Sequence, residues 1–221
     1  MNKIINISLF LLIVLAACNN AEEQKKVISI DEFVDNTLEN KLCLINYRYP
    51  VFRFNGEKIN PLNDSISHYF DKQINSFLSL AKKDSSLLLQ EKKKYRMDME
   101  ATQFVTNFGT VSVLITAYKY TLGAHGNYTY KAYNYDMAYN KFMKLSDVVS
   151  TADNKKFTEL NQMLNRNFNK KDCFTKAPVI DKNFELFLIK QDSVIFLFPP
   201  YELGPYACGL ASVGVAIDEL P

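Results

Sequence analysis

The stretch that organises this chain is residues 118–136, with the sequence YKYTLGAHGNYTYKAYNYD. Two runs rich in aromatic and β-branched residues flank a short polar segment, residues 123–127, that contains two glycines. Such runs favour extended strands, and a glycine-containing break between two of them is typical of a β-hairpin with a slightly long connection. The stretch therefore predicts a hairpin around which the other elements are arranged.

Segments on both sides of this hairpin are also predicted to be strands. The runs 95–106 and 110–122 carry apolar residues in alternation, and a glycine-containing turn at residues 107–109 connects them. Together with the hairpin, these runs predict an antiparallel meander of at least three strands. Further strands are predicted at residues 42–54, 184–189, 194–198 and 211–217. Pro50 restricts the first of these to an edge or a bulge.

Two segments have the spacing of amphipathic helices. The first can be capped by Asn63 or Asp64, and the second by Asp153 or Asn154. The first apolar stripe consists of Ile66, Phe70, Ile74, Phe77, Leu78 and Ala81, and the second of Phe157, Leu160, Met163, Leu164 and Phe168. The chain is therefore predicted to have an α+β fold, with an antiparallel β-sheet of hairpins or a meander and two main helices packed on it.

The composition is that of an ordinary globular protein. Of the 221 residues, 48% are apolar and 23% are charged, and the formal net charge is +2. So balanced a charge gives no electrostatic basis for binding nucleic acid, which is not an expected partner. Abundant tyrosine and phenylalanine, with few glycines and prolines, favour broad sheets over disorder.

The amino-terminus has the pattern of a secretory signal peptide. Lys3 precedes an apolar run, residues 4–15, which is too short to cross a bilayer comfortably. The run leads into Leu15-Ala16-Ala17-Cys18, which resembles the lipobox of bacterial lipoproteins. The resemblance implies cleavage before Cys18, a lipid on its sulfur and acylation with chains such as palmitate. The alternative is a plain signal peptide followed by an incidental cysteine.

This resemblance implies where the protein lies. Several acyl chains on one residue anchor a protein to a membrane without spanning it. We therefore expect a signal peptide at residues 1–17, a lipidated cysteine and tether at residues 18–40, and the membrane as a partner through the lipid on Cys18. The expected location is the bacterial cell envelope, at the outer membrane on its periplasmic or surface face.

Three cysteines remain after Cys18, namely Cys43, Cys173 and Cys208. Export would place them in an oxidising compartment, where disulfides persist. Because three is an odd number, at most one pair forms within the chain, and the sequence does not select the pair. No metal site or cofactor is expected, because the chain has no CxxC motif and its two histidines, His68 and His125, lie far apart.

Three segments, taken in order, resemble a known family. They are residues 123–136, which begin Gly-Ala-His-Gly-Asn and end Tyr-Asn-Tyr-Asp; residues 144–149, Lys-Leu-Ser-Asp-Val-Val; and residues 198–209, Phe-Pro-Pro-Tyr-Glu-Leu-Gly-Pro-Tyr-Ala-Cys-Gly. In that order and spacing they look like the RsiV-like DUF3298 domain. The region from Cys43 to Leu122 is similar to its usual partner, DUF4163. The resemblance implies a DUF4163-like half at residues 41–122 and a DUF3298-like half at residues 123–221.

Members of this pair of families are exported or lipid-anchored bacterial proteins. They form the extracytoplasmic part of lysozyme-sensing anti-sigma factors, and the amino-terminal half also precedes some peptidoglycan deacetylase domains. This sequence departs from those relatives, since no cytoplasmic segment, transmembrane helix or deacetylase domain is evident. Leu122 stands where a second glycine is usual, and Cys208 stands where a small residue is more frequent. The resemblance therefore implies an extracytoplasmic module.

The leading hypothesis is a lipid-anchored binding module of the cell envelope that is not an enzyme. A rigid loop of prolines and tyrosines beside a tyrosine-rich sheet offers a preformed contact surface. The expected ligand is a lysozyme-like protein or peptidoglycan. The expected ligand-binding residues are Pro199, Tyr201, Tyr206 and, on a neighbouring hairpin, His125. The alternative at each position is a structural role in a turn or at a core edge.

Two rival hypotheses remain open. The first is a hydrolase of envelope polymers with His125 as base and Asp136 or Glu202 as its carboxylate partner, although the spacing does not demand it. No catalytic residue is therefore assigned. The second is a scaffold lipoprotein whose tyrosine face docks a membrane complex, which a large exposed apolar patch would favour.

Overall fold

The computed structural model describes residues 27–106, 109–168 and 173–221. The expectations for the signal peptide, for Cys18 and for residues 19–26 lie outside the described residues. The other part of the expected tether does not behave as one, because Ile28–Glu39 forms the long strand β1. In the described part of the chain, no helix is long and apolar enough to cross a membrane.

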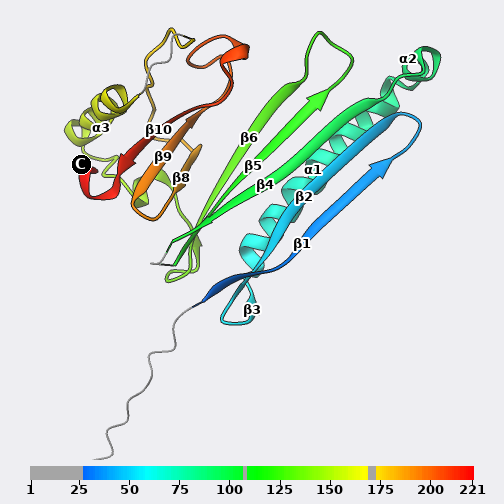
Figure 1. The fold of residues 1–221 in the computed structure, drawn as a ribbon. Helices are drawn as coiled ribbons and strands as arrows, with labels where there is room; N and C mark the ends of the chain where they lie inside the picture. The colour runs from blue at the N-terminus through cyan, green and yellow to red at the C-terminus, as the bar shows by residue number, and fades with distance from the viewer. Residues whose placement is uncertain (1–26, 107–108, 169–172) are drawn as a thin grey trace, which may run out of the picture.

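A large sheet forms the amino-terminal body of the molecule (Figure 1). Its strand order is β1-β2-β4-β5-β6-β7, and β3 pairs with β2. After β1, its strands are β2 (Cys43–Phe54), β3 (Glu57–Lys58), β4 (Tyr95–Val105), β5 (Thr110–Tyr120), β6 (Asn127–Asp136) and β7 (Lys141–Phe142). The expected meander of β4, β5 and β6 is confirmed, with antiparallel pairing throughout.

The pairing of β2 with β4 is parallel, unlike the other pairs of this sheet. Parallel neighbours need a crossover connection, and α1 (Asn60–Lys83) and α2 (Ser85–Glu91) supply it. β2 is therefore an inner strand, whereas Pro50 predicted an edge or a bulge; the β1–β2 register does shift next to Pro50, between Ile30 and Glu32. Pairing with β4 ends at Arg48, so β2 has only β1 beside it at Pro50, which tolerates the missing N–H.

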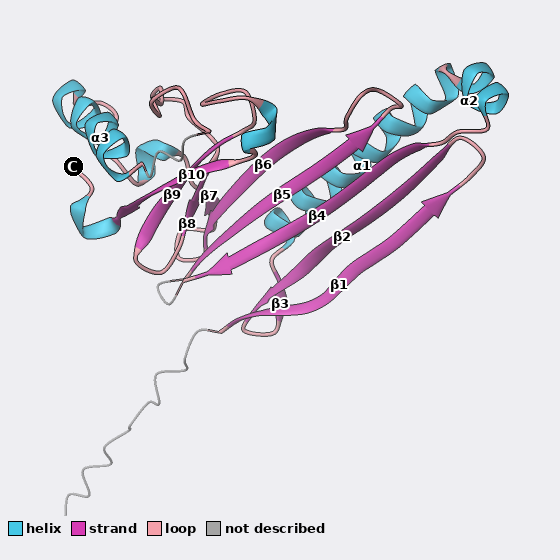
Figure 2. Ribbon diagram, turned by 45° about the horizontal axis from the view of Figure 1, so that its top comes forward, coloured by secondary structure: helices cyan, strands magenta, loops and turns pink. Residues whose placement is uncertain are grey.

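Helix α1 covers one face of the large sheet, as Figures 1 and 2 show. The predicted stripe is confirmed, since Ile66, Phe70 and Phe77 are buried together with their neighbours at helical spacing. The expected cap is wrong, because the helix already begins at Asn60, before both Asn63 and Asp64, with a proline in its first turn. The side chain of Asn63 instead binds the backbone of Phe52, accepting from its N–H at 2.8 Å and donating to its carbonyl at 2.9 Å.

The carboxy-terminal part forms a second sheet with its own core. Its order is β10-β9-β8, and α3 (Asn154–Asn167) lies against β10. The strands are β8 (Phe187–Ile189), β9 (Ser193–Phe198) and β10 (Ala211–Ala216), with short 3-10 helices η1 (Leu145–Asp147), η2 (Tyr206–Cys208) and η3 (Ile217–Glu219). Asp153 caps α3 as predicted, accepting from the backbone N–H groups of Lys155 and Lys156.

A buried polar network joins the two sheets. The hydroxyl of Ser112 on β5 donates to Oδ1 of Asn134 on β6 at 2.6 Å. The Asn134 amide donates to the carbonyl of Phe187 on β8 at 2.9 Å, and the Ile189 N–H donates to the Ser112 hydroxyl at 2.9 Å. Because buried polar groups are costly unless they are paired, this network fixes how β8 lies on the large sheet. The α+β prediction is confirmed, with two sheets where one was expected.

Candidate functional site

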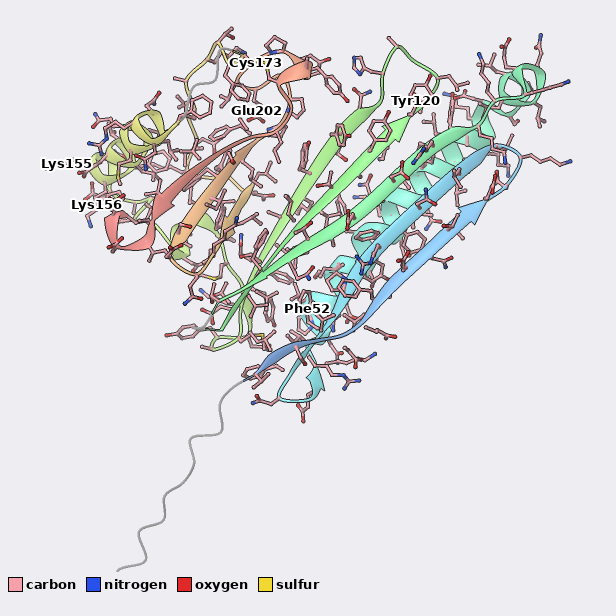
Figure 3. The ribbon with its side chains drawn as sticks, in the orientation of Figure 1. Phe52, Tyr120, Lys155, Lys156, Cys173 and Glu202 are labelled. Atoms are coloured by element: carbon pink, nitrogen blue, oxygen red, sulfur yellow. A yellow bond between two sulfur atoms is a disulfide. The ribbon has the colours of Figure 1, made fainter. Side chains whose placement is uncertain are left out.

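Aromatic side chains from the two parts of the chain meet beside the end of β5. We call this group the tyrosine surface; its members are Tyr118, His125, Tyr128, Tyr130, Tyr201 and Tyr206. The first four belong to β5, β6 and their connection, and the last two to the loop after β9. Figure 3 labels Tyr120, at the end of β5, and Glu202, in the loop after β9.

The strand register explains how three of these rings come together. Tyr118 and Tyr128 are cross-strand partners, with ring centroids 5.0 Å apart. Tyr130 lies two residues from Tyr128 and therefore on the same face of the sheet, where the two rings stack at 6.2 Å. Tyr128 stays 43% exposed. The alternation predicted from the sequence thus produces a row of rings that solvent can reach.

The loop after β9 docks onto the β5–β6 connection through Tyr206. Its ring stacks on His125 at a centroid distance of 4.2 Å, and its hydroxyl donates to the Gly126 carbonyl at 2.6 Å. Nδ1 of His125 lies 2.8 Å from the same carbonyl, which only accepts hydrogen bonds. Nδ1 therefore carries a proton, and Nε2 is the ring nitrogen left for a ligand.

The loop itself is held in one shape by several contacts. Cys173 and Cys208 form a disulfide, and Cys43 is free and buried. The backbone N–H groups of Thr175 and Lys176 both donate to the Leu203 carbonyl. Such bracing keeps the neighbouring Tyr201 at a φ of 76°, a left-handed conformation that a bulky residue rarely adopts. Tyr201 is 59% exposed and lies 5.6 Å from the Tyr206 ring.

Gly126 is required by the close approach of Tyr118. A Cβ atom built on Gly126 would lie 2.5 Å from the Tyr118 hydroxyl oxygen and nearer still to two ring carbons. We expect Gly126→Ala to displace the Tyr118 ring and to weaken ligand binding to the tyrosine surface several-fold. The unfolding midpoint should move little, because the end of a side chain can rotate away. Tyrosine fluorescence and a binding titration measure the two effects.

Gly123→Ala is the matched control for this prediction. It lies in the same connection, and its Cβ would meet only the His125 carbonyl, at 3.7 Å. Binding should therefore match that of the natural chain. Equal loss of binding in both variants would contradict the role given to Gly126.

The predicted ligand-binding residues are only partly brought together. His125, Tyr201 and Tyr206 lie in one surface. Pro199 is half-buried at the base of the loop, where its carbonyl accepts from the Glu202 N–H at 3.1 Å and closes a turn. Tyr118, Tyr128 and Tyr130 were not predicted as site residues, although their alternation in the sequence is the signal that could have found them.

The rival hydrolase arrangement is not assembled around Asp136. Asp136 ends β6, whereas His125 precedes the strand, so a rise of about 3.3 Å per residue separates them by roughly 30 Å. Asp136 instead accepts from the backbone N–H groups of Ala138 and Tyr139. Partial burial raises the pKa of Glu202. Within the described residues, no group of three or more His, Cys, Asp or Glu side chains could hold a metal ion.

Partial burial and neighbouring phenols raise the pKa of two tyrosines in the tyrosine surface. Burial, then Tyr128, Tyr118 and Tyr201, raise the pKa of Tyr206 above its usual value. Burial, then Tyr128 and Tyr206, raise the pKa of Tyr130. These rings are therefore neutral at physiological pH and present aromatic faces and hydroxyl groups, which suit a neutral polar ligand.

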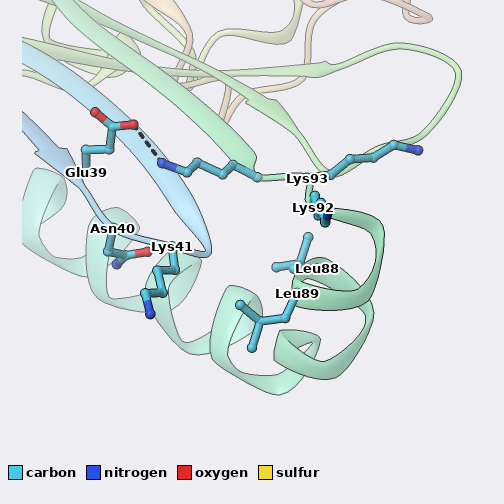
Figure 4. A pocket seen from close by; sticks show the side chains of 8 residues that line it. Glu39, Asn40, Lys41, Leu88, Leu89, Lys92 and Lys93 are labelled. Atoms are coloured by element: carbon cyan, nitrogen blue, oxygen red, sulfur yellow. Dashed lines mark hydrogen bonds and ion pairs between the residues drawn. The ribbon is translucent and has the colours of Figure 1, made fainter.

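A hollow of about 570 Å³, separate from the tyrosine surface, lies where α2 meets the β1–β2 turn (Figure 4). Lysines dominate its lining, and two of them are paired: Lys94 with Glu39 at 2.7 Å and Lys93 with Glu91 at 3.5 Å. The remaining lining residues are Asn40, Lys41, Leu88, Leu89 and Lys92. Residues 91–94 are all exposed, so this charged segment is solvated.

Two family models match the chain in sequence. Residues 37–128 match the model described as Deacetylase PdaC, and residues 137–218 match the model of the protein family of unknown function DUF3298. The boundary between the two matches falls within β6. The tyrosine surface therefore draws His125 and Tyr128 from the first matched region and Tyr201 and Tyr206 from the second. The expected match of the first region to DUF4163 stays a prediction.

Several known proteins are similar to this chain. The peptidoglycan-N-acetylmuramic acid deacetylase PdaC of Bacillus subtilis is 26% identical over 192 residues, which are 81% of this chain but only 39% of that protein. The immunogenic protein MPT64 of Mycobacterium tuberculosis is 25% identical over 97% of this chain and 98% of its own length. A solved DUF3298 member from Bacteroides fragilis shares the fold, with a TM-score of 0.56 at 17% identity over 88% of this chain and 92% of that one.

These comparisons correct one expectation and establish another. The expectation that the chain is not an enzyme is contradicted by the match to the Deacetylase PdaC model and by the deacetylase relative. That expectation rested on the absence of any motif within the chain that demands catalysis. The expected DUF3298 resemblance is confirmed both by the family model and by the shared fold. Residues 137–218 are therefore similar to the DUF3298 family.

Proposed function

We propose that this protein has a cell-wall-related function and binds the glycan strands of peptidoglycan on the tyrosine surface. The observation that carries the proposal is the docking of Tyr206 on His125 and Gly126, which joins rings from both matched regions into one exposed surface. Binding sites are frequent where two such units meet. The deacetylase relative, whose name specifies peptidoglycan, supports the choice of polymer.

Glycan recognition suits the chemistry of these rings. The apolar C–H face of a pyranose ring packs against the electron-rich face of an aromatic ring, while phenol hydroxyls bond the sugar hydroxyls. Tyrosine gives this contact area at low entropic cost, and the braced loop reduces the cost further. Because neutral phenols make up most of this surface, binding should depend little on salt concentration.

The site would be presented at the cell envelope. We propose that cleavage before Cys18 and lipidation of that cysteine hold the protein at a bacterial membrane. Cys18→Ser should then release the protein from the membrane fraction of cells that express it. Retention of this variant in the membrane fraction would contradict the anchor.

The test of glycan binding uses Tyr206→Ala, which removes both the stack on His125 and the bond to Gly126. We expect its dissociation constant for purified peptidoglycan fragments to rise about tenfold or more, since aromatic stacking contributes on the order of 1–3 kcal/mol per ring. Calorimetry measures the constants at two salt concentrations. Tyr139→Ala is the control, because Tyr139 is 76% exposed and lies outside the tyrosine surface.

Two results would contradict this function. The first is equal affinity for the fragments in Tyr206→Ala and in the natural chain. The second is binding of lysozyme by the natural chain without binding of fragments, which would assign the surface to a lysozyme-like protein. Loss of affinity in Tyr139→Ala as well would show that the measured binding does not involve this surface.

A second candidate function is removal of acetyl groups from peptidoglycan, which the match of residues 37–128 to the Deacetylase PdaC model favours. This chain spans 39% of the deacetylase relative, so the activity must be measured on the chain itself. Acetate release from purified peptidoglycan is the assay. Release that persists in Tyr206→Ala but stops in His125→Ala would support this candidate through Nε2 of His125.

A further inference from the structure

We infer that a second site, beside the open edge of β6, binds an acidic peptide branch of the same polymer whose glycan lies on the tyrosine surface. The inference deepens the proposed function and rests on it. The site is a cavity of about 640 Å³ where the large sheet meets the second sheet, within the range of ordinary ligand pockets. All of its lining residues belong to the described part of the chain.

The cavity combines aromatic walls with a positive charge. Tyr133, Phe142 and Phe184 contribute rings, and Leu145 and Phe187 close its floor from the buried core. Three lysines and one glutamate complete the charged part of the lining: Lys131, Lys144, Lys182 and Glu185. The net charge of the lining is therefore positive, and the complementary ligand carries carboxylates next to apolar side chains.

The hydrogen-bond partners of these lysines differ from those of lysines on an ordinary solvated surface. The ammonium of Lys182 donates to the neutral Oδ1 of Asn154 at 2.7 Å, so the bond leaves its charge uncompensated. Lys131 is paired with Glu185 at 2.9 Å, but that carboxylate is 79% exposed. Lys144 is exposed at the edge of the cavity. A ligand carboxylate can thus pair with Lys144 and Lys182 without breaking a buried interaction.

Backbone groups of β6 also favour an extended peptide as the ligand. The Met143 N–H donates to the Asn134 carbonyl, so the backbone of Asn134 faces away from β5 on this side. Strand alternation points the backbone of Ala132 the same way. Pairing with β7 stops at Tyr135, so Ala132 has no strand beside it there and lines the cavity. An extended peptide can therefore add to this edge.

The two sites are close enough to hold one branched molecule. Tyr130 of the tyrosine surface and Ala132 of the cavity are two residues apart on β6, roughly 7 Å along the strand. A glycan over Tyr128 and Tyr130 can therefore send a side branch along the strand edge into the cavity. Peptidoglycan has this branched form, with peptides that carry free carboxylates attached to its sugars.

The test compares fragments that keep their peptide with the same sugars after an amidase has removed it. In the double variant Lys144→Gln/Lys182→Gln, we expect affinity for the peptide-bearing fragment to fall about tenfold, because bonds to charged groups are lost. Affinity for the bare sugar should not change. Tyr206→Ala should weaken the binding of both fragments. A result that contradicts peptide binding in the cavity can therefore be told apart from one that contradicts glycan binding on the tyrosine surface.

The matched control is Lys82→Gln/Lys83→Gln, which removes the same charge from the end of α1, outside the cavity. It should bind both fragments as the natural chain does, and added salt should weaken binding of the peptide-bearing fragment only. Four results would overturn the inference. The natural chain could bind the two fragments equally, or the cavity variant could keep its full affinity for the peptide-bearing fragment. The control variant could lose as much affinity as the cavity variant, or free acetate could displace the bare sugar from the natural chain.

Discussion

Replacing both Cys173 and Cys208 with serine is expected to lower the free energy of unfolding by about 3–4 kcal/mol. The disulfide closes a loop with a sequence separation of 35 and so removes conformational freedom from the unfolded chain. The disulfide also ties the loop after β9 to Cys173. Gly204 of this loop packs closely against the same residue, because a Cβ atom built on Gly204 would lie 2.8 Å from the Cys173 carbonyl oxygen. Denaturant unfolding of the double variant measures the loss.

Reducing agent supplies the control for this prediction. It should lower the unfolding midpoint of the natural chain to that of the double variant, and it should leave the variant unchanged. Affinity for peptidoglycan fragments should fall with the midpoint, because Tyr201 and Tyr206 are carried by the same loop. A natural chain whose midpoint does not respond to reductant would refute a stabilising disulfide.

The variant Asn134→Ala is expected to destabilise the protein by about 2–4 kcal/mol. Asn134 is 3% exposed, and its removal leaves the Phe187 carbonyl without its donor and the Ser112 hydroxyl without its acceptor. Buried polar groups that lose a partner pay their desolvation cost without compensation. Because the network joins the two sheets, the loss should appear in both sheets.

Hydrogen exchange and denaturant unfolding test this second prediction. Exchange should accelerate at the Ile189 N–H, which donates to Ser112, and along β8. Asn183→Ala is the matched control, since Asn183 is exposed and its side chain is not part of the network. A change below about 0.5 kcal/mol, the level of an ordinary surface substitution, would show that the network does not join the sheets.

Local patterns in the sequence predicted most of the regular elements. The meander of β4, β5 and β6, the stripe of α1 and the Asp153 cap of α3 were all correct, because alternation, helical spacing and capping depend on neighbouring residues. β1, which lies within the expected tether, carries no such local pattern. Most of its side chains are exposed and lack a clear alternation, so its conformation depends on pairing with β2.

The candidate site was only partly accessible from the sequence. Tyr201 and Tyr206 stood out in a rigid loop and His125 in a glycine-rich connection, but Tyr201 lies 76 positions after His125 in the chain. Nothing in the sequence says that Tyr206 stacks on His125 or that Gly126 binds its hydroxyl. The pairing of Cys173 with Cys208, left open among three cysteines, likewise depends on which loops meet in space.

The sequence by itself determined most of the strands, the two main helices, the faces on which tyrosines alternate and the DUF3298 resemblance, because each depends on residues near one another in the chain. Tertiary structure alone decided the parallel contact of β2 with β4, the joining of two sheets through Asn134 and the assembly of the tyrosine surface. Each of these pairs residues far apart in sequence. Their contacts are selected by packing of the whole chain and leave no periodic pattern in any one segment.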